Sequence, residues 1–117
     1  ISAIYNKKEE EHIVNVRNQG TLDFMKNNDV VEITCQVGAE GITPLPVKDF
    51  HNQHIKSMMR TIKDFEKMTI QAAVNGDYDI ALSAMLINPL IGDYSKAKKV
   101  LVEALEANRD YLPQFFE

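Results

Sequence analysis

Three histidines and one cysteine are the side chains of this 117-residue sequence that suit metal ligation or nucleophilic chemistry. His51 and His54 are three positions apart, a spacing that brings two imidazoles to one ion on a helix, but no third ligand follows nearby. We therefore interpret them, with the isolated His12, as surface residues. Cys35 lies among β-branched residues with no basic neighbour, which favours core packing over nucleophilic catalysis.

A second group of polar side chains lies at the end of an expected strand. Asn15, Arg17 and Asn18 gather amide and guanidinium donors there, and these groups suit sugar hydroxyls or a phosphate. Taken alone, the pattern is a weaker signal than an ordinary polar turn. Glu66 is a further candidate, either as a partly buried carboxylate that anchors an arginine or as a solvated helix residue. The sequence has no glycine-rich dinucleotide motif, no Walker loop and no Cys-x-x-Cys pair.

The elements that must position these residues begin with strands. Residues 12–18 place two valines on one face and Asn15 and Arg17 on the other, as a strand does. Residues 30–37 are rich in β-branched types and predict the clearest strand of the chain. A glycine-flanked turn then leads to a short strand at 42–45, which two prolines limit to a sheet edge.

After this strand the apolar spacing changes to three and four residues, which is typical of helices. We expect Asp49 to cap a long helix that carries Phe50 on its apolar stripe. Asn75 and Gly76 are a suitable end for it.

Two further helices follow in the predicted order. Asp77 is expected to start a helix that stops before Pro89, and Asp93 a third helix that includes Leu112 on its apolar side. A small, mainly antiparallel sheet followed by three helices is an α+β fold.

Composition and charge exclude several functional classes. The chain is 44% hydrophobic and 26% charged, typical of one globular domain, and no apolar run approaches the roughly 20 residues of a membrane span. A net charge of −4 with dispersed lysines argues against nucleic acid as a partner. The single cysteine cannot form an internal disulfide, which favours the cytoplasm. Because the chain starts without methionine, in apolar helical spacing, we expect its amino terminus to be a cut within a helix.

Six segments in one order carry a family resemblance. They include His-Ile-Val-Asn-Val-Arg-Asn-Gln-Gly at 12–20, Val-Val-Glu-Ile-Thr-Cys at 30–35 and Gly-Ile-Thr-Pro-Leu at 41–45. Phe-Glu-Lys-Met-Thr-Ile-Gln-Ala-Ala, Asn-Pro-Leu-Ile and Glu-Ala-Asn-Arg-Asp-Tyr-Leu-Pro-Gln-Phe follow. Together they resemble the carboxy-terminal region of family 4 glycoside hydrolases, over nearly the whole chain. The 6-phospho-β-glucosidases are the branch to which the chain is most similar.

The resemblance implies an NAD-dependent mechanism that differs from ordinary glycoside hydrolysis. In this family NAD oxidises the sugar C3 hydroxyl, a base removes the C2 proton, the aglycone is eliminated, water adds, and the hydride returns. The fold implied is that of the lactate and malate dehydrogenase-like carboxy-terminal domain. The cofactors implied for the full-length parent are NAD and a divalent metal, usually Mn²⁺.

The family's nucleotide-binding loop, metal ligands and tyrosine base all precede the region that is matched. The resemblance therefore implies that residues 1–117 are a C-terminal substrate and oligomerisation domain, without the dinucleotide-binding domain, the cofactors or catalytic residues. It also implies a cytoplasmic homo-oligomer whose substrate is a phosphorylated disaccharide. Asn15, Arg17 and Asn18 are the expected contributors to the sugar-phosphate pocket. For Arg17 the structural alternative is a salt bridge to another domain.

Several alternatives stay open at this point. The 6-phospho-α-glucosidase and α-galactosidase branches share the same motifs. A free-standing interaction or oligomerisation module with the same fold is a second possibility, and a dehydrogenase of the lactate and malate type is a third. The segment 108–115 favours the glycosidase family over the dehydrogenases.

Overall fold

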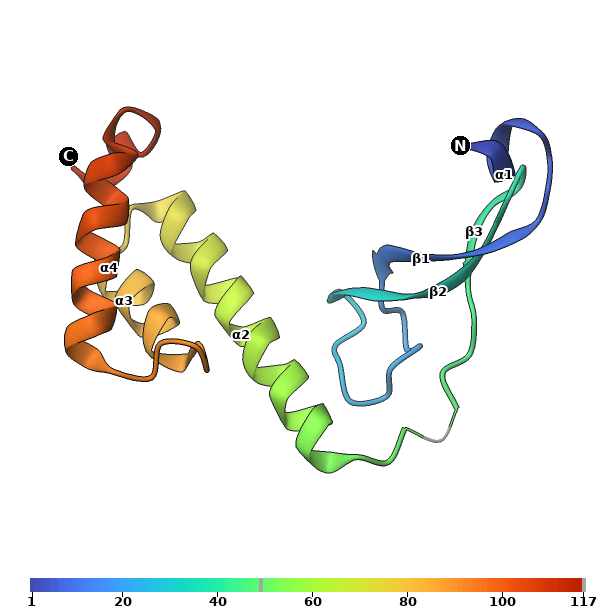
Figure 1. Cartoon of the computed structure of the whole chain (residues 1–117), viewed down its shortest axis with the longest axis horizontal. Coiled ribbons are helices and arrows are strands. Elements are labelled where there is room, and N and C mark those ends of the chain that lie inside the picture. The colour runs from blue at the N-terminus through green and yellow to red at the C-terminus, as the bar shows by residue number, and fades with distance from the viewer. Residues whose placement is uncertain (49, 117) are drawn as a thin grey trace. The chain divides into compact units, whose positions relative to one another are not determined.

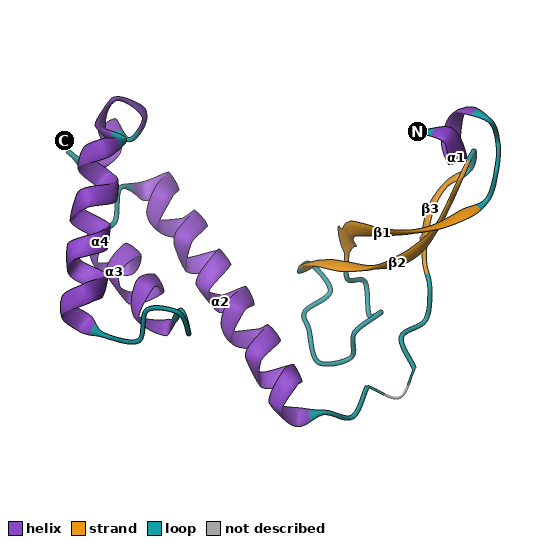
Figure 2. Ribbon diagram, in the orientation of Figure 1, coloured by secondary structure: helices purple, strands orange, loops and turns teal. Residues whose placement is uncertain are grey.

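The computed structural model describes residues 1–48 and 50–116 and divides the chain into two compact units. Unit 1 is Ile1–Asn52 and contains all the strands, whereas unit 2 is Gln53–Glu117 and is helical (Figures 1 and 2). A three-stranded antiparallel sheet followed by helices confirms the predicted α+β class.

Unit 1 is built on a sheet with the strand order β1-β2-β3. Side chains alternate between buried and exposed along β2, because successive residues of a strand point to opposite faces. The strand predicted at residues 30–37 is therefore confirmed. The elements of this unit are α1 (Ser2–Tyr5), β1 (Glu10–Arg17), β2 (Val30–Gly38) and β3 (Gly41–Pro44).

Phe50 differs from its expected place on the helix stripe. It precedes the helix and belongs to unit 1, where its ring stacks on Phe24 with centroids 5.6 Å apart and an interplanar angle of 16°. Stacked aromatic rings at this separation stabilise a loop beyond the apolar area they bury. An aromatic residue at three-and-four spacing was thus assigned to the wrong element, because periodicity does not distinguish a helix start from the loop before it.

Unit 2 consists of three helices whose ends follow the predicted caps. Asp77 accepts a hydrogen bond from the backbone N–H of Ile80, and Asp93 accepts one from that of Lys96. Such side-chain caps satisfy donors that have no partner within the helix. The helices are α2 (Gln53–Asn75), α3 (Tyr78–Ile87) and α4 (Tyr94–Ala107), followed by the short 3₁₀ helices η1 (Arg109–Tyr111) and η2 (Pro113–Phe115).

Two helix boundaries differ from the sequence prediction. The long helix begins at Gln53, and its expected cap, Asp49, lies outside the described residues. The third helix ends at Ala107, so that Leu112 falls between η1 and η2, where it still packs against the core of unit 2. Leu112 therefore reaches the core although the helix has ended before it.

Helix α2 keeps part of its apolar surface exposed. Met58 is 47% exposed and Ile62, four positions later on the same side, is 37% exposed, whereas Ala72 is buried against the core formed with α3 and α4. None of the helices in the described parts of the chain is both long enough and apolar enough to cross a membrane. The exposed residues thus leave α2 with a surface that suits protein contact.

The turn after α2 provides a test of the packing in unit 2. Gly76 has φ +69°, and a Cβ added there would collide with the carbonyl oxygen of Gln114. We expect Gly76→Ala to lower the free energy of unfolding by about 3 kcal/mol, the sum of left-handed strain and overpacking. Urea denaturation followed by helical circular dichroism measures the change.

Gly92→Ala is the matched control, since Gly92 has φ +56° but an added Cβ would contact nothing within 4 Å. Gly92→Ala should lower the free energy of unfolding by only about 1–2 kcal/mol, from the left-handed backbone strain alone. Equal losses for the two variants would contradict the docking of the C-terminal segment against Gly76.

Candidate functional site

The exposed face of the sheet in unit 1 carries two of the predicted site residues. Asn15 and Arg17 are two positions apart on β1, so they lie on the same face, and both are exposed. The pairing with β2 places Glu32 opposite Asn15 and Val30 opposite Arg17. The structure therefore brings Asn15 and Arg17 together, as the sequence predicted.

Neither of these side chains is engaged within the described parts of the chain. Arg17 makes no ion pair or hydrogen bond with another described residue, and Glu32 on the same face is equally unpaired there. A free guanidinium presents a planar fork of N–H donors that matches a phosphate. The Asn15 amide and the Glu32 carboxylate add a donor and acceptors suited to hydroxyl groups. This face has the groups needed to bind a polyhydroxylated anion.

Asn18, the third predicted residue, is placed differently. It is 0% exposed. Its side-chain Nδ2 donates to the carbonyls of Leu22, Met25 and Lys26 at 3.0, 3.1 and 3.2 Å. Its Oδ1 accepts from the backbone N–H of Leu22 at 2.7 Å. Because the carboxamide is fully used, Asn18 acts as a positioning residue for the loop between β1 and β2.

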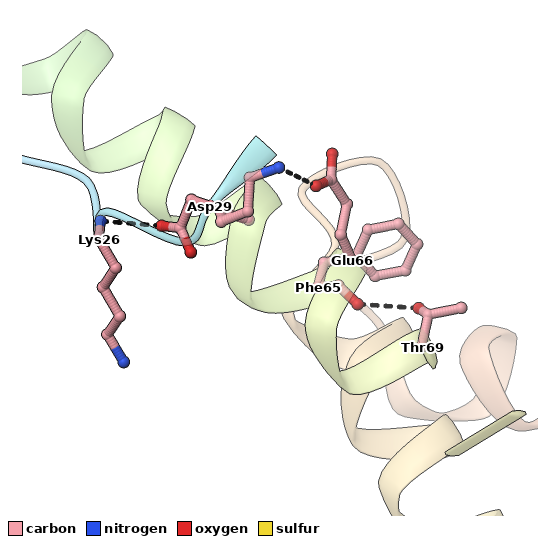
Figure 3. A network of polar contacts seen from close by, with 6 residues as sticks. Lys26, Asp29, Phe65, Glu66 and Thr69 are labelled. Carbon is pink, nitrogen blue, oxygen red and sulfur yellow. Dashed lines mark hydrogen bonds and ion pairs between the residues drawn. The ribbon is translucent and has the colours of Figure 1, made fainter. Parts of the chain in front are cut away.

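The far end of the same loop is held by backbone and carboxylate contacts. The N–H of Asn18 donates to the carbonyl of Asp29 at 2.7 Å, and that of Gln19 donates to Asn27 at 3.0 Å. The Asp29 carboxylate accepts from the backbone N–H of Lys26 at 3.0 Å (Figure 3). The loop thus closes directly next to Arg17 and Val30, the last pair of the β1–β2 ladder.

Glu66 is a solvated helix residue, the second of its two predicted roles. Its half-exposed carboxylate pairs with Lys63, three residues earlier on α2, and not with an arginine (Figure 3). Such surface pairs contribute little to stability. We therefore assign Glu66 no role in a site.

The histidines and the cysteine do not form a metal centre in this chain. His12 is exposed and contacts Glu10 at 3.2 Å, and His51 precedes the helix that contains His54. The Cys35 thiol is buried and donates to the Ile33 carbonyl. Within residues 1–48 and 50–116, no group of three or more His, Cys, Asp or Glu side chains is arranged to hold a metal ion. The residues present do not fit a Mn²⁺ site.

The connection from sheet to helix is equally unsuited to a dinucleotide. A nucleotide-binding βα turn needs glycines where the backbone approaches the pyrophosphate. Between β3 and α2 the sequence is Leu-Pro-Val-Lys-Asp-Phe-His-Asn, with no glycine. This connection therefore lacks the glycines of a nucleotide-binding turn.

Glu32 is the candidate that the sequence analysis missed. The strand that contains it was predicted, but its position opposite Asn15 depends on the register between β1 and β2. The loop from Asn18 to Asp29 fixes that register, and single-sequence periodicity contains no information about it. A two-residue hairpin turn between the strands would have revealed the register from the sequence, because such turns fix how the two strands pair.

Asn18 provides a sharp test of how this site is positioned. Asn18→Asp removes the Nδ2 donor and turns a carboxylate oxygen toward three carbonyls. We expect unit 1 to lose about 3 kcal/mol of stability, since buried groups are left unpaired. Amide hydrogen exchange across residues 19–29 should accelerate.

Asn28→Asp makes the same chemical change at an exposed position of the same loop. Its effect should stay within about 0.5 kcal/mol. If amide hydrogen exchange across residues 19–29 is unchanged in Asn18→Asp, Asn18 does not position the loop.

Comparison with known proteins places this geometry in a family. Residues 1–91 match the family 4 glycosyl hydrolase C-terminal domain. The chain is 41% identical over 116 residues to a probable 6-phospho-beta-glucosidase of Bacillus subtilis (strain 168), covering 99% of this chain and 26% of that protein.

Two solved structures agree with this match. A 6-phospho-alpha-glucosidase from gut microorganisms, in complex with NAD and Mn²⁺, has a TM-score of 0.86 at 29% identity, covering 96% of this chain and 25% of that one. The 6-phospho-beta glucosidase of Thermotoga maritima, with manganese, NAD⁺ and glucose-6-phosphate, has a TM-score of 0.78 at 34% identity, covering 91% and 26%. The chain spans about a quarter of the length of these relatives. It belongs to the family 4 glycosyl hydrolases, and residues 1–91 match their C-terminal domain.

Proposed function

We propose that this chain is the C-terminal part of a larger NAD-dependent 6-phospho-β-glucosidase. The observation that carries the proposal is the unpaired guanidinium of Arg17 on an exposed sheet face, beside the amide of Asn15, in a chain of this family. Residues 1–117 then form the substrate and oligomerisation domain, and a dinucleotide-binding domain belongs to the rest of the parent.

The substrate class we propose is a disaccharide or glycoside that carries a 6-phosphate. Sequence identity supports the β-anomer, because it is 41% and 34% for the two β-glucosidases and 29% for the α-glucosidase. The higher TM-score of the α-glucosidase reflects the backbone alone and has less weight for anomeric specificity. The α-glucosidase and α-galactosidase branches are therefore the alternatives to be tested.

Asn15, Arg17 and Asn18 take different roles in this proposal. Arg17 donates to the phosphate, Asn15 bonds a sugar hydroxyl, and Asn18 contributes through the loop that its buried carboxamide holds. Glu32, opposite Asn15, accepts from a second hydroxyl. A guanidinium binds a phosphate more strongly than neutral N–H donors do, because its hydrogen bonds are charge-assisted.

NAD and Mn²⁺ belong to the remainder of the parent in this account. The related structures contain NAD and manganese, which supports both cofactors for a full-length member of the family. We assign no catalytic step to residues of this chain, and we expect the isolated chain neither to bind NAD nor to hydrolyse substrate. Isothermal titration showing tight NAD binding to the isolated chain would contradict this.

The experiment is an assay of the full-length parent with NAD and Mn²⁺. We expect turnover of 4-nitrophenyl 6-phospho-β-glucoside, and much less of the α-anomer or of the unphosphorylated β-glucoside. Arg17→Ala should lower kcat/KM for the phosphorylated substrate by about 10- to 100-fold, the equivalent of one charge-assisted hydrogen bond.

Lys98→Ala is the matched control, since it removes one exposed positive charge from α4 in unit 2. It should leave kcat/KM unchanged. No turnover of the β-substrate under these conditions would overturn the assignment, and equal effects of the two variants would remove Arg17 from the phosphate site.

We further propose that the parent is a cytoplasmic homo-oligomer. The exposed apolar residues of α2, among them Met58 and Ile62, support a contact with another subunit or with the rest of the parent. The single free thiol of Cys35 fits a reducing compartment. Sedimentation velocity that detects only monomer at high concentration would count against the oligomer.

The second candidate function is a free-standing oligomerisation module, and the same exposed face of α2 favours it. The gene sequence upstream of Ile1 separates the two functions. An in-frame dinucleotide-binding motif supports the enzyme, and a start codon directly before Ile1 supports the module.

A further inference from the structure

Unit 2 contains an apolar cavity of about 180 Å³, partly open to solvent, among its three helices and its C-terminal segment. Alanines line it from two sides, with Ala72 and Ala73 on α2 and Ala81 and Ala84 on α3. Protein interiors seldom contain voids much larger than a water molecule. An engineered apolar cavity of about 150 Å³ is known to stay dry and to bind benzene. The void in unit 2 is therefore large enough for a six-membered ring.

The lining restricts what can enter. Thr69 carries the hydroxyl group of the lining, and it already donates to the carbonyl of Phe65 at 2.8 Å (Figure 3). The other lining side chains are apolar. A hydroxyl, amide or charge placed in the cavity would lose its hydrogen bonds to water at a cost of about 1–3 kcal/mol or more. The cavity therefore offers sugars and phosphates no free polar partner in its lining.

The walls favour an aromatic occupant over an aliphatic one. Phe65 and Phe115 line the cavity, and both rings can form edge-to-face contacts with a bound ring. Met85 adds a thioether, which interacts favourably with aromatic rings.

One wall of the cavity belongs to the C-terminal segment, which is anchored independently. Leu112 and Phe115 contribute this wall. The side chain of Gln114 between them donates to the carbonyl of Ala73 at 2.5 Å, and its backbone lies against Gly76. An occupant therefore contacts the helices and this segment at once, and should tighten the contact between them.

We propose that this cavity in unit 2 is a binding site for a small, uncharged, monocyclic aromatic molecule. The site is separate from the sheet face in unit 1, and it does not rest on the proposed glycosidase function. Its failure would leave the assignment of Arg17 untouched.

The test uses the 117-residue chain with toluene as the probe, followed by ¹H–¹³C NMR of the alanine methyl groups. We expect saturable shifts for the methyls of Ala72, Ala81 and Ala84, and a rise in the thermal midpoint. Cyclohexane, of similar size, should bind at least tenfold more weakly. Glucose 6-phosphate should leave these methyls unshifted.

Ala73→Leu fills the cavity from its rim and should weaken toluene binding at least tenfold. Val74→Leu is the matched control on the same turn of α2, because Val74 is 74% exposed and does not line the cavity. If Ala73→Leu fails to fold by circular dichroism, Met85→Ala replaces it, and this enlarged cavity should take naphthalene, which the unmodified chain excludes.

Three results would overturn the proposal. The first is the absence of saturable methyl shifts with toluene. The second is equal toluene affinity in Ala73→Leu and Val74→Leu. The third is a concentration-dependent dimer that Ala73→Leu abolishes while toluene has no effect, which would assign the cavity to a side chain of a second copy.

Discussion

The buried carboxamide of Asn18 is the interaction on which the polar face of unit 1 depends. One side chain satisfies the carbonyls of Leu22, Met25 and Lys26 and the N–H of Leu22, in a loop without regular secondary structure. Backbone groups in such a loop would otherwise be buried without partners or exposed to water. Holding this loop closed fixes the end of the β1–β2 ladder, and with it the position of Arg17.

Exposure and complete burial meet at two consecutive positions of the chain. Arg17 points its charge to solvent, and the next residue, Asn18, is completely buried. In unit 2 the same division holds on a larger scale, since Ala72 packs in the core whereas Val74 is exposed. Each unit therefore has side chains packed in its core and other side chains that are exposed and open to contact with another molecule. Such exposed sides suit the proposed place of the chain within a larger protein of its family.

The sequence predicted the strand faces, the caps at Asp77 and Asp93 and the end of α2, because each depends on local chemistry. It did not predict the stacking of Phe50 on Phe24 or the packing of Leu112 from outside a helix, because these contacts are tertiary. For the site, residue type and alternation were sufficient to select Asn15 and Arg17. The burial of Asn18 could not be predicted, since asparagine in a turn is ordinarily exposed and only the folded loop brings three carbonyls to one amide.

The most direct measurement of this account is the hydrogen-exchange rate of the Asn18 side-chain amide protons, by NMR of the 117-residue chain. We predict exchange at least about 100-fold slower than for the exposed Asn15 amide, equivalent to about 2.7 kcal/mol of opening free energy. Exchange of the two amides at the same rate would contradict the account, because the carboxamide of Asn18 would then not hold the loop beside Arg17.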